Sequence, residues 1–234
     1  MSPSNSIPEK NQDFEADVAR IQEIFSARIA KYGDTPQSAE HLDRATQEKR
    51  MDLIAEVAPL EDAKILDFGC ATGHLLTFLR ERHGFAGEYV GYDITQEMID
   101  IAAAKFPDAR FECRNILEEG VPEDFDYVFI SGTFNDLTPH NWNLMQSALK
   151  ALYPRTRKAI AFNNLTTYVD YFDDHLFYVS PEQVFRFCKE ELSPCVTLRH
   201  DYQVKEGSMP YEFTTYVYRS EFDPRKNLDL ASSR

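Results

Sequence analysis

The residues best placed to do chemistry lie around one loop, where Asp67, Gly69 and Gly73 follow one another at short spacing. The apolar run 65–68 predicts a buried strand, and the leucine spacing in 74–79 predicts the start of a helix. A chain that passes from strand to helix through glycines turns backbone N–H groups towards a ligand. Asp67 falls at the carboxyl end of the strand, where open α/β sheets bind ligands. The pattern therefore predicts a ligand site at this sheet edge.

Three later segments add polar residues at the same edge. The predicted strand 88–93 ends at Asp93, at about the distance of 20 residues where an acid bonds ribose hydroxyls. The predicted strand 109–113 is followed by Asn115 and Ile116. The predicted strand 125–130 is apolar throughout from Tyr127 to Ile130, and the polar and aromatic residues Ser131, Phe134 and Asn135 follow it.

The first loop separates two cofactor classes. A nicotinamide or flavin fingerprint needs three glycines as G-x-G-x-x-G, but Ala71 and His74 occupy the second and third positions counted from Gly69. The spacing Asp-x-Gly-x-x-x-Gly instead resembles motif I of the class I S-adenosylmethionine-dependent methyltransferases, here with Cys70 inside the loop. The exit 131–135 resembles motif IV of that family, the wall nearest the transferred methyl group.

The resemblance implies roles for individual residues. Asp93 is expected to bond the ribose, Ile94 to pack on adenine and Met98 to flank the same face. Most family members carry Asp where this chain has Asn115, so adenine recognition and a capped turn are equally open here. Gln47 or Arg50 is expected to reach the cofactor carboxylate, with a solvated helix face as the alternative. The expected cofactor-binding residues are Asp67, Gly69, Cys70, Gly73, Asp93, Ile94, Met98, Asn115, Ile116, Ser131 and Arg50.

Methyl transfer asks the protein mainly for orientation and a dry site, although an amine or hydroxyl acceptor must also lose a proton. We expect His200, near the end of a predicted strand, to act as the base, and Asn135 to lie at the reacting centre; a structural role for His200 is the alternative. The expected substrate-binding residues are Tyr32, Phe134, Tyr168, Tyr171 and Tyr178. The aromatic and acidic segment 164–178 suits a cationic amine, or is a folded surface loop.

These segments predict an α/β protein of Rossmann-like class. The resemblance to the methyltransferase family implies a seven-stranded, mostly parallel sheet with an antiparallel last strand, helices on both faces and an N-terminal helical lid. The predicted divisions are a disordered tail at 1–12, lid helices at 13–58, the methyltransferase domain at 59–222 and a frayed tail at 223–234.

The composition restricts the partners. Among 234 residues, 39 acids stand against 25 bases, and a net charge of −14 repels nucleic acid. The four cysteines form no CxxC pair, so we expect no metal site and reduced thiols in the cytoplasm. No signal peptide or membrane span is predicted. The sequence therefore predicts methyl transfer to a small-molecule nitrogen or oxygen atom. Protein or nucleic-acid methylation, or a non-catalytic module on the same fold, are the alternatives, and the oligomeric state is open.

Overall fold

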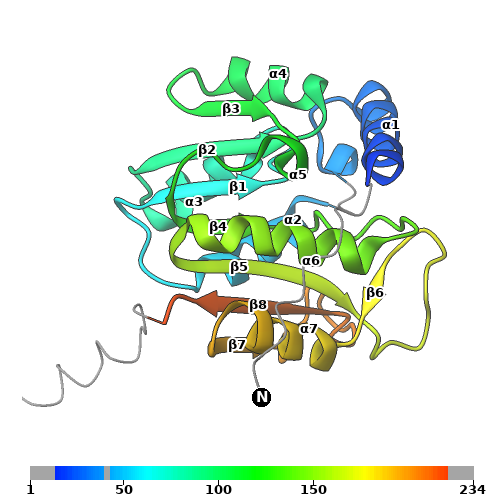
Figure 1. The fold of residues 1–234 in the computed structure, drawn as a ribbon. Coiled ribbons are helices and arrows are strands. Elements are labelled where there is room, and N and C mark those ends of the chain that lie inside the picture. The colour runs from blue at the N-terminus through cyan, green and yellow to red at the C-terminus, as the bar shows by residue number, and fades with distance from the viewer. Residues whose placement is uncertain (1–13, 40–42, 221–234) are drawn as a thin grey trace, which may run out of the picture.

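A computed structural model describes residues 14–39 and 43–220 of the chain. Its centre is a twisted sheet in the order β3-β2-β1-β4-β5-β8-β7, and β6 pairs with β5 beside this path (Figure 1). The strands are β1 Lys64–Phe68, β2 Glu88–Asp93, β3 Arg110–Cys113, β4 Phe125–Ile130, β5 Thr156–Thr166, β6 Tyr178–Val179, β7 Cys195–Arg199 and β8 Glu212–Tyr218. The predicted Rossmann-like sheet is confirmed, with the two-residue β6 in addition to the seven expected strands.

The direction of the strands also matches the prediction. Strands β1 to β5 pair in parallel with their neighbours, whereas β8 runs antiparallel between β5 and β7. The last two strands are shorter than expected, because the prediction extended them over 195–202 and 211–218. As a result His200 lies beyond the end of β7.

Helices cover both faces of the sheet (Figure 1). They are α1 Glu15–Tyr32, α2 Arg44–Ala55, α3 His74–His83, α4 Gln96–Lys105, α5 Ile116–Glu119, α6 Asn141–Leu152 and α7 Pro181–Phe187. Successive strand residues point to opposite faces, so Leu66 packs in the core beneath α6 while Ile65 packs in the core beneath α2 and α3. Both strand faces are buried, which explains the continuous apolar runs in the sequence.

The sequence predicts N-terminal helices at 13–32 and at about 42–58, and the structure has α1 at Glu15–Tyr32 and α2 at Arg44–Ala55. Asp43 caps α2 by accepting a hydrogen bond from the Thr46 N–H at 2.8 Å, which satisfies a free donor at the helix start. The predicted tails and the predicted first residue of the second helix, residue 42, fall outside the described residues. None of the helices in the described part is long and apolar enough to span a membrane.

Candidate active site

A first cavity, of about 140 Å³, opens at the carboxyl ends of β1, β2 and β4. Nine of the expected cofactor-binding residues and one expected substrate-binding residue form part of its wall; they are Asp67, Gly69, Cys70, Asp93, Ile94, Met98, Asn115, Ile116, Ser131 and Phe134. These residues come from four separate strand ends and the segments that follow them. The parallel sheet brings them together because all four strands end at the same edge.

The glycine loop is bound to the end of β2. The N–H groups of Gly69 and Cys70 both donate to the Tyr92 carbonyl, at 2.7 and 3.0 Å, and the Ala71 N–H donates to the Asp93 carboxylate at 2.9 Å. Gly69 has a φ of +82°, and a Cβ built there would lie 2.3 Å from Thr133 Oγ1. Only glycine therefore fits this position without moving the neighbouring strand exit.

Asp93 connects that loop to the next helix. Its second carboxylate oxygen accepts the Thr95 N–H at 2.9 Å, just before α4. Burial raises the pKa of Asp93, and the backbone N–H bonds oppose that effect. One acid thus holds the turn after β1 and the turn after β2 in a fixed relation.

Asp67 has a less polar environment. Its carboxyl group is buried, with 3% of the residue exposed, and accepts a hydrogen bond from the Tyr89 hydroxyl. Burial, opposed by the Tyr89 hydrogen bond and assisted by the nearby Asp93 charge, raises the pKa of Asp67 to about 7. Two strand-end carboxyl groups therefore face one cavity.

The structure distinguishes between the two alternatives for Asn115. Its side-chain oxygen accepts the Leu117 N–H at 3.1 Å and its amide donates to Glu118 at 2.9 Å, so it caps α5. Asn115 also lines the cavity, but its side chain is already committed to this cap.

Helices α1 and α2 close the other side of the cavity. Val18, Ile21 and Phe25 of α1 and Gln47 and Met51 of α2 line it. The side-chain oxygen of Gln47 is buried and has no hydrogen-bond partner among the described residues. An unsatisfied acceptor at this position is suited to a ligand donor.

One ion pair and two hydrogen bonds hold α1 against the sheet edge. Arg28 contacts Asp136 at 2.9 Å, and Asp17 contacts His140 at 2.8 Å. The Gln22 amide donates to the Ile94 carbonyl at 2.8 Å. These contacts place α1 over the segments that follow β2 and β4.

A second cavity, of about 420 Å³, adjoins the first. Both are lined by Phe25, Ala39 and Gly132. The wall of the second cavity includes the expected residues Asn135, Tyr171 and Tyr178, together with Asp136, Asp170, Asp173, Met209, Tyr211 and Glu212. The side-chain oxygen of Asn135 is buried there without a partner among the described residues.

The structure places Arg50 differently from the prediction. Its guanidinium lines the second cavity, not the first, and pairs with Glu212 of β8. The expected contact with a cofactor carboxylate in the first cavity therefore loses its basis. The carboxylate of Glu212 is fully buried, and Arg50 is the cation that compensates its charge.

Four other expected residues lie outside the walls of both cavities. His200, the expected base, contacts the Pro210 carbonyl at 3.2 Å, because β7 ends one residue earlier and the chain turns away. The Tyr168 hydroxyl donates to Glu182, and Tyr32 is 40% exposed beside Lys31. Gly73 stands at the N-cap of α3 with a φ of +77° and shapes the loop.

The sequence reasoning missed several lining residues. His74, for which no role was predicted, lines the first cavity, as do Asp34 and Thr35. Burial, together with Arg44 and Lys105, lowers the pKa of His74 to about 4, so it is neutral near pH 7. Its position directly after Gly73 was the available signal. Among the described residues, no group of three or more His, Cys, Asp or Glu side chains is arranged to hold a metal ion.

The sheet order and the paired strand-end acids define the class I methyltransferase fold, and comparisons with known proteins agree. Residues 65–155 match a family model described as a methyltransferase domain. A protein of Mycobacterium tuberculosis named as a methyltransferase is 34% identical over 162 residues, which cover 67% of this chain and 93% of the relative. The chain belongs to the class I S-adenosylmethionine-dependent methyltransferases, and the cofactor of this class is S-adenosylmethionine.

Two further matches are less similar in sequence. A trans-aconitate 2-methyltransferase of Afipia carboxidovorans is 31% identical over 98 residues, covering 42% of this chain and 38% of the relative. The crystal structure of magnesium protoporphyrin IX methyltransferase from Synechocystis with bound S-adenosylmethionine superposes with a TM-score of 0.63 at 12% identity, covering 93% of this chain and all of that one. This second likeness shows the shared fold.

Proposed function

We propose that this enzyme methylates a nitrogen or oxygen atom of a small molecule, with S-adenosylmethionine in the first cavity and the acceptor in the second. The observation that carries this proposal is the common wall of Phe25, Ala39 and Gly132. Two ligands that meet at such a wall can bring their reacting atoms into line, which is most of what this reaction requires.

The residues of the first cavity fit the cofactor. Asp67 and Asp93 offer carboxyl groups to its cationic and hydroxyl groups, and Ile94, Met98 and Ile116 offer apolar surface to adenine. The side-chain oxygens of Gln47 and Ser131 are buried without a partner in the described part of the chain, and each can take part in a further hydrogen bond. S-adenosylmethionine supplies a methyl group already activated on a positively charged sulfur.

The charges of the second cavity favour an acceptor that carries an amine. Arg50, the one cation in its wall among the described residues, is paired with Glu212, whereas Asp136, Asp170 and Asp173 add acids. Of these acids, Asp136 is paired with Arg28. The rings of Tyr171 and Tyr178 suit cation–π contact. A nearby carboxylate can take the proton that an amine must lose before it is methylated.

The acidic surface does not favour the alternative of a nucleic-acid substrate. A net charge of −14 opposes approach to a phosphate backbone. Titration with the cofactor distinguishes the proposal from a non-catalytic role, and the panel of acceptors distinguishes it from protein methylation.

Calorimetric titration with S-adenosylmethionine and separately with NAD tests the cofactor assignment. We expect binding of the first alone, and loss of that binding in Asp93→Ala and Gly69→Val with the fold retained by circular dichroism. Arg155→Ala, at an exposed ion pair with Asp124, is the control and should bind as the wild type does.

The acceptor is tested by measuring S-adenosylhomocysteine release with a panel of small amines and size-matched carboxylic acids. We expect turnover with amines first. If the protein binds the cofactor and methylates no panel member but does methylate protein extracts, its substrate is a protein and not a small molecule. Absence of cofactor binding would support the non-catalytic module.

A further inference from the structure

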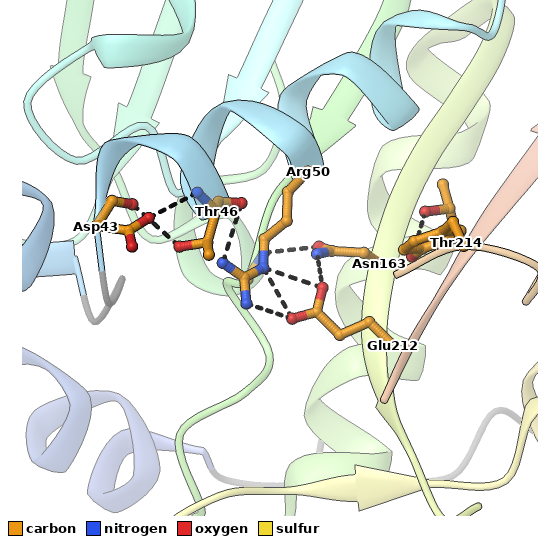
Figure 2. Close-up of polar contacts among 8 residues, drawn as sticks. Asp43, Thr46, Arg50, Asn163, Glu212 and Thr214 are labelled. Atoms are coloured by element: carbon orange, nitrogen blue, oxygen red, sulfur yellow. Dashed lines mark hydrogen bonds and ion pairs between the residues drawn. The ribbon is translucent and has the colours of Figure 1, made fainter. Parts of the chain in front are cut away.

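Three polar side chains from three elements form one hydrogen-bonded chain (Figure 2). Arg50 of α2 donates from Nε to both carboxylate oxygens of Glu212, at 2.8 and 3.0 Å, and from Nη2 to one of them. Asn163 of β5 donates from its amide to Glu212 at 3.0 Å. The residue exposures are 0% for Glu212 and 2% for Asn163, so water does not compete for these bonds.

The far end of this chain reaches the wall between the two cavities. The side-chain oxygen of Asn163 accepts the Gly132 N–H at 2.8 Å, and the Gly132 carbonyl accepts the Asn135 N–H at 3.1 Å. Gly132 lines both cavities and has a φ of +75°. The turn from Gly132 to Asn135 is thus held from β5 through one side chain.

The pair Arg50–Glu212 determines which way the Asn163 amide points. An ionised carboxylate only accepts hydrogen bonds, so the Asn163 NH₂ group must face Glu212 and its oxygen must face Gly132. Arg50 donates to both carboxylate oxygens of Glu212 and so compensates the charge of this buried group. A change at α2 or β8 therefore reaches the cavity wall through the orientation of one amide.

We propose that Asn163 is a positioning residue for methyl transfer, held in orientation by Arg50–Glu212, and that it fixes the turn Gly132–Asn135 between cofactor and acceptor. Asn163 lines neither cavity and acts through Gly132. The assignment rests on the proposed function. In methyl transfer the reacting atoms must approach to about 3–3.5 Å, so a small displacement of the turn between the two ligands lowers the rate.

An exchange of amide and carboxylate provides the test. Asn163→Asp alone sets two carboxylates side by side, and Glu212→Gln alone leaves the Arg50 charge uncompensated. The double variant Asn163→Asp/Glu212→Gln moves the negative charge from β8 to β5. The amide now on β8 can then donate to the carboxylate on β5 and accept from Arg50, and a carboxylate oxygen remains for the Gly132 N–H. We expect each single variant to lower kcat by at least about tenfold, and the double variant to return within about threefold of wild type.

The Gly132 amide gives a readout that needs neither cofactor nor acceptor. Its NMR resonance should shift, and its exchange with solvent should accelerate, in each single variant and return in the double variant. Val217→Ala removes fully buried atoms from β8 without changing Arg50, Glu212 or Asn163, so it controls for lowered stability. At temperatures well below its melting temperature, this variant should have the kcat of the wild type.

Three results would overturn the proposal. They are unchanged kcat in both single variants, additive losses in the double variant, and a restored Gly132 resonance without restored turnover. If the wild type transfers no methyl group to any acceptor, the proposed function fails. The Gly132 resonance still reports whether the hydrogen bonds of Arg50, Glu212 and Asn163 orient the turn.

Discussion

Among single residues, Asp67 combines a functional position with an unfavourable environment for charge. It ends β1 inside the first cavity, yet it is buried and its hydrogen-bond partner is the neutral Tyr89 hydroxyl. Burial raises its pKa to about 7, so the folded protein keeps a proton that an unfolded chain loses near its usual value of about 3.9. The stability of the fold must therefore depend on pH through this group.

The sign of that dependence can be tested. The contribution of Asp67 is fully present below about pH 3.9 and is lost as the pH rises towards about 7, because the folded state binds more protons over this range. Asp67→Asn keeps an acceptor for Tyr89 without a charge, and we expect it to raise the free energy of unfolding at pH 8 by a few kcal/mol, at about 1.4 kcal/mol per pKa unit. Urea unfolding from pH 5 to 8 measures this.

Glu190→Gln, at an exposed position, is the matched control and should leave the pH slope unchanged. The same loss of stability from pH 5 to 8 in Asp67→Asn as in the wild type would mean that another group causes it.

At the scale of elements, α1 connects the first cavity to the loop after β4. It contributes Val18, Ile21 and Phe25 to the cavity, and the Arg28–Asp136 pair holds it there. Asp136 is 6% exposed, and the Arg28 guanidinium compensates its charge. The position of a helix that forms a cavity wall therefore rests on a contact made outside that cavity.

Removing this contact should weaken cofactor binding. Arg28→Met leaves Asp136 without this guanidinium, and we expect the Kd for S-adenosylmethionine to rise by about tenfold and the free energy of unfolding to fall by about 1–3 kcal/mol. Calorimetry and hydrogen exchange of the α1 amides measure both effects.

The double variant Arg28→Met/Asp136→Asn should recover part of the lost cofactor affinity and stability, since it also removes the carboxylate that Arg28→Met leaves without its guanidinium. Lys31→Ala, on the exposed side of α1, should bind the cofactor as the wild type does. Unchanged affinity in Arg28→Met would show that α1 does not need this contact to form the wall.

At the scale of the whole molecule, the first cavity is built from α1, α2 and the ends of the central strands. A ligand in it contacts the N-terminal helices and the sheet at once. Binding should therefore stabilise these parts together against unfolding.

We expect a single thermal transition that moves upward with S-adenosylmethionine. At about one hundred times Kd the ligand adds about 2.7 kcal/mol, which raises Tm by roughly 5–10 °C for a chain of this length. Differential scanning calorimetry measures the shift, with NAD as the control that should leave Tm unchanged. Two separate transitions, only one of them moved by the ligand, would show that the helices and the sheet unfold independently.

Local patterns in the sequence were sufficient for most of the fold and for the cofactor side of the site. The apolar runs of β1 and β4, the glycines at 69 and 73 and the acid at 93 each follow from strand periodicity or backbone sterics, which act over a few residues. Once these elements join one parallel sheet, their carboxyl ends meet at the same edge. The sequence by itself therefore determined the class of protein and the part of the first cavity's wall that the strand ends supply.

Only the tertiary structure decided the partners of Arg50, the position of His200 and the second cavity. Arg50 and Glu212 are 162 positions apart, and a helix face that looks solvated in the sequence becomes buried when α2 packs on β8. His200 leaves the site because β7 ends at Arg199. Such pairings depend on how distant elements pack, and burial then determines which charges must be compensated.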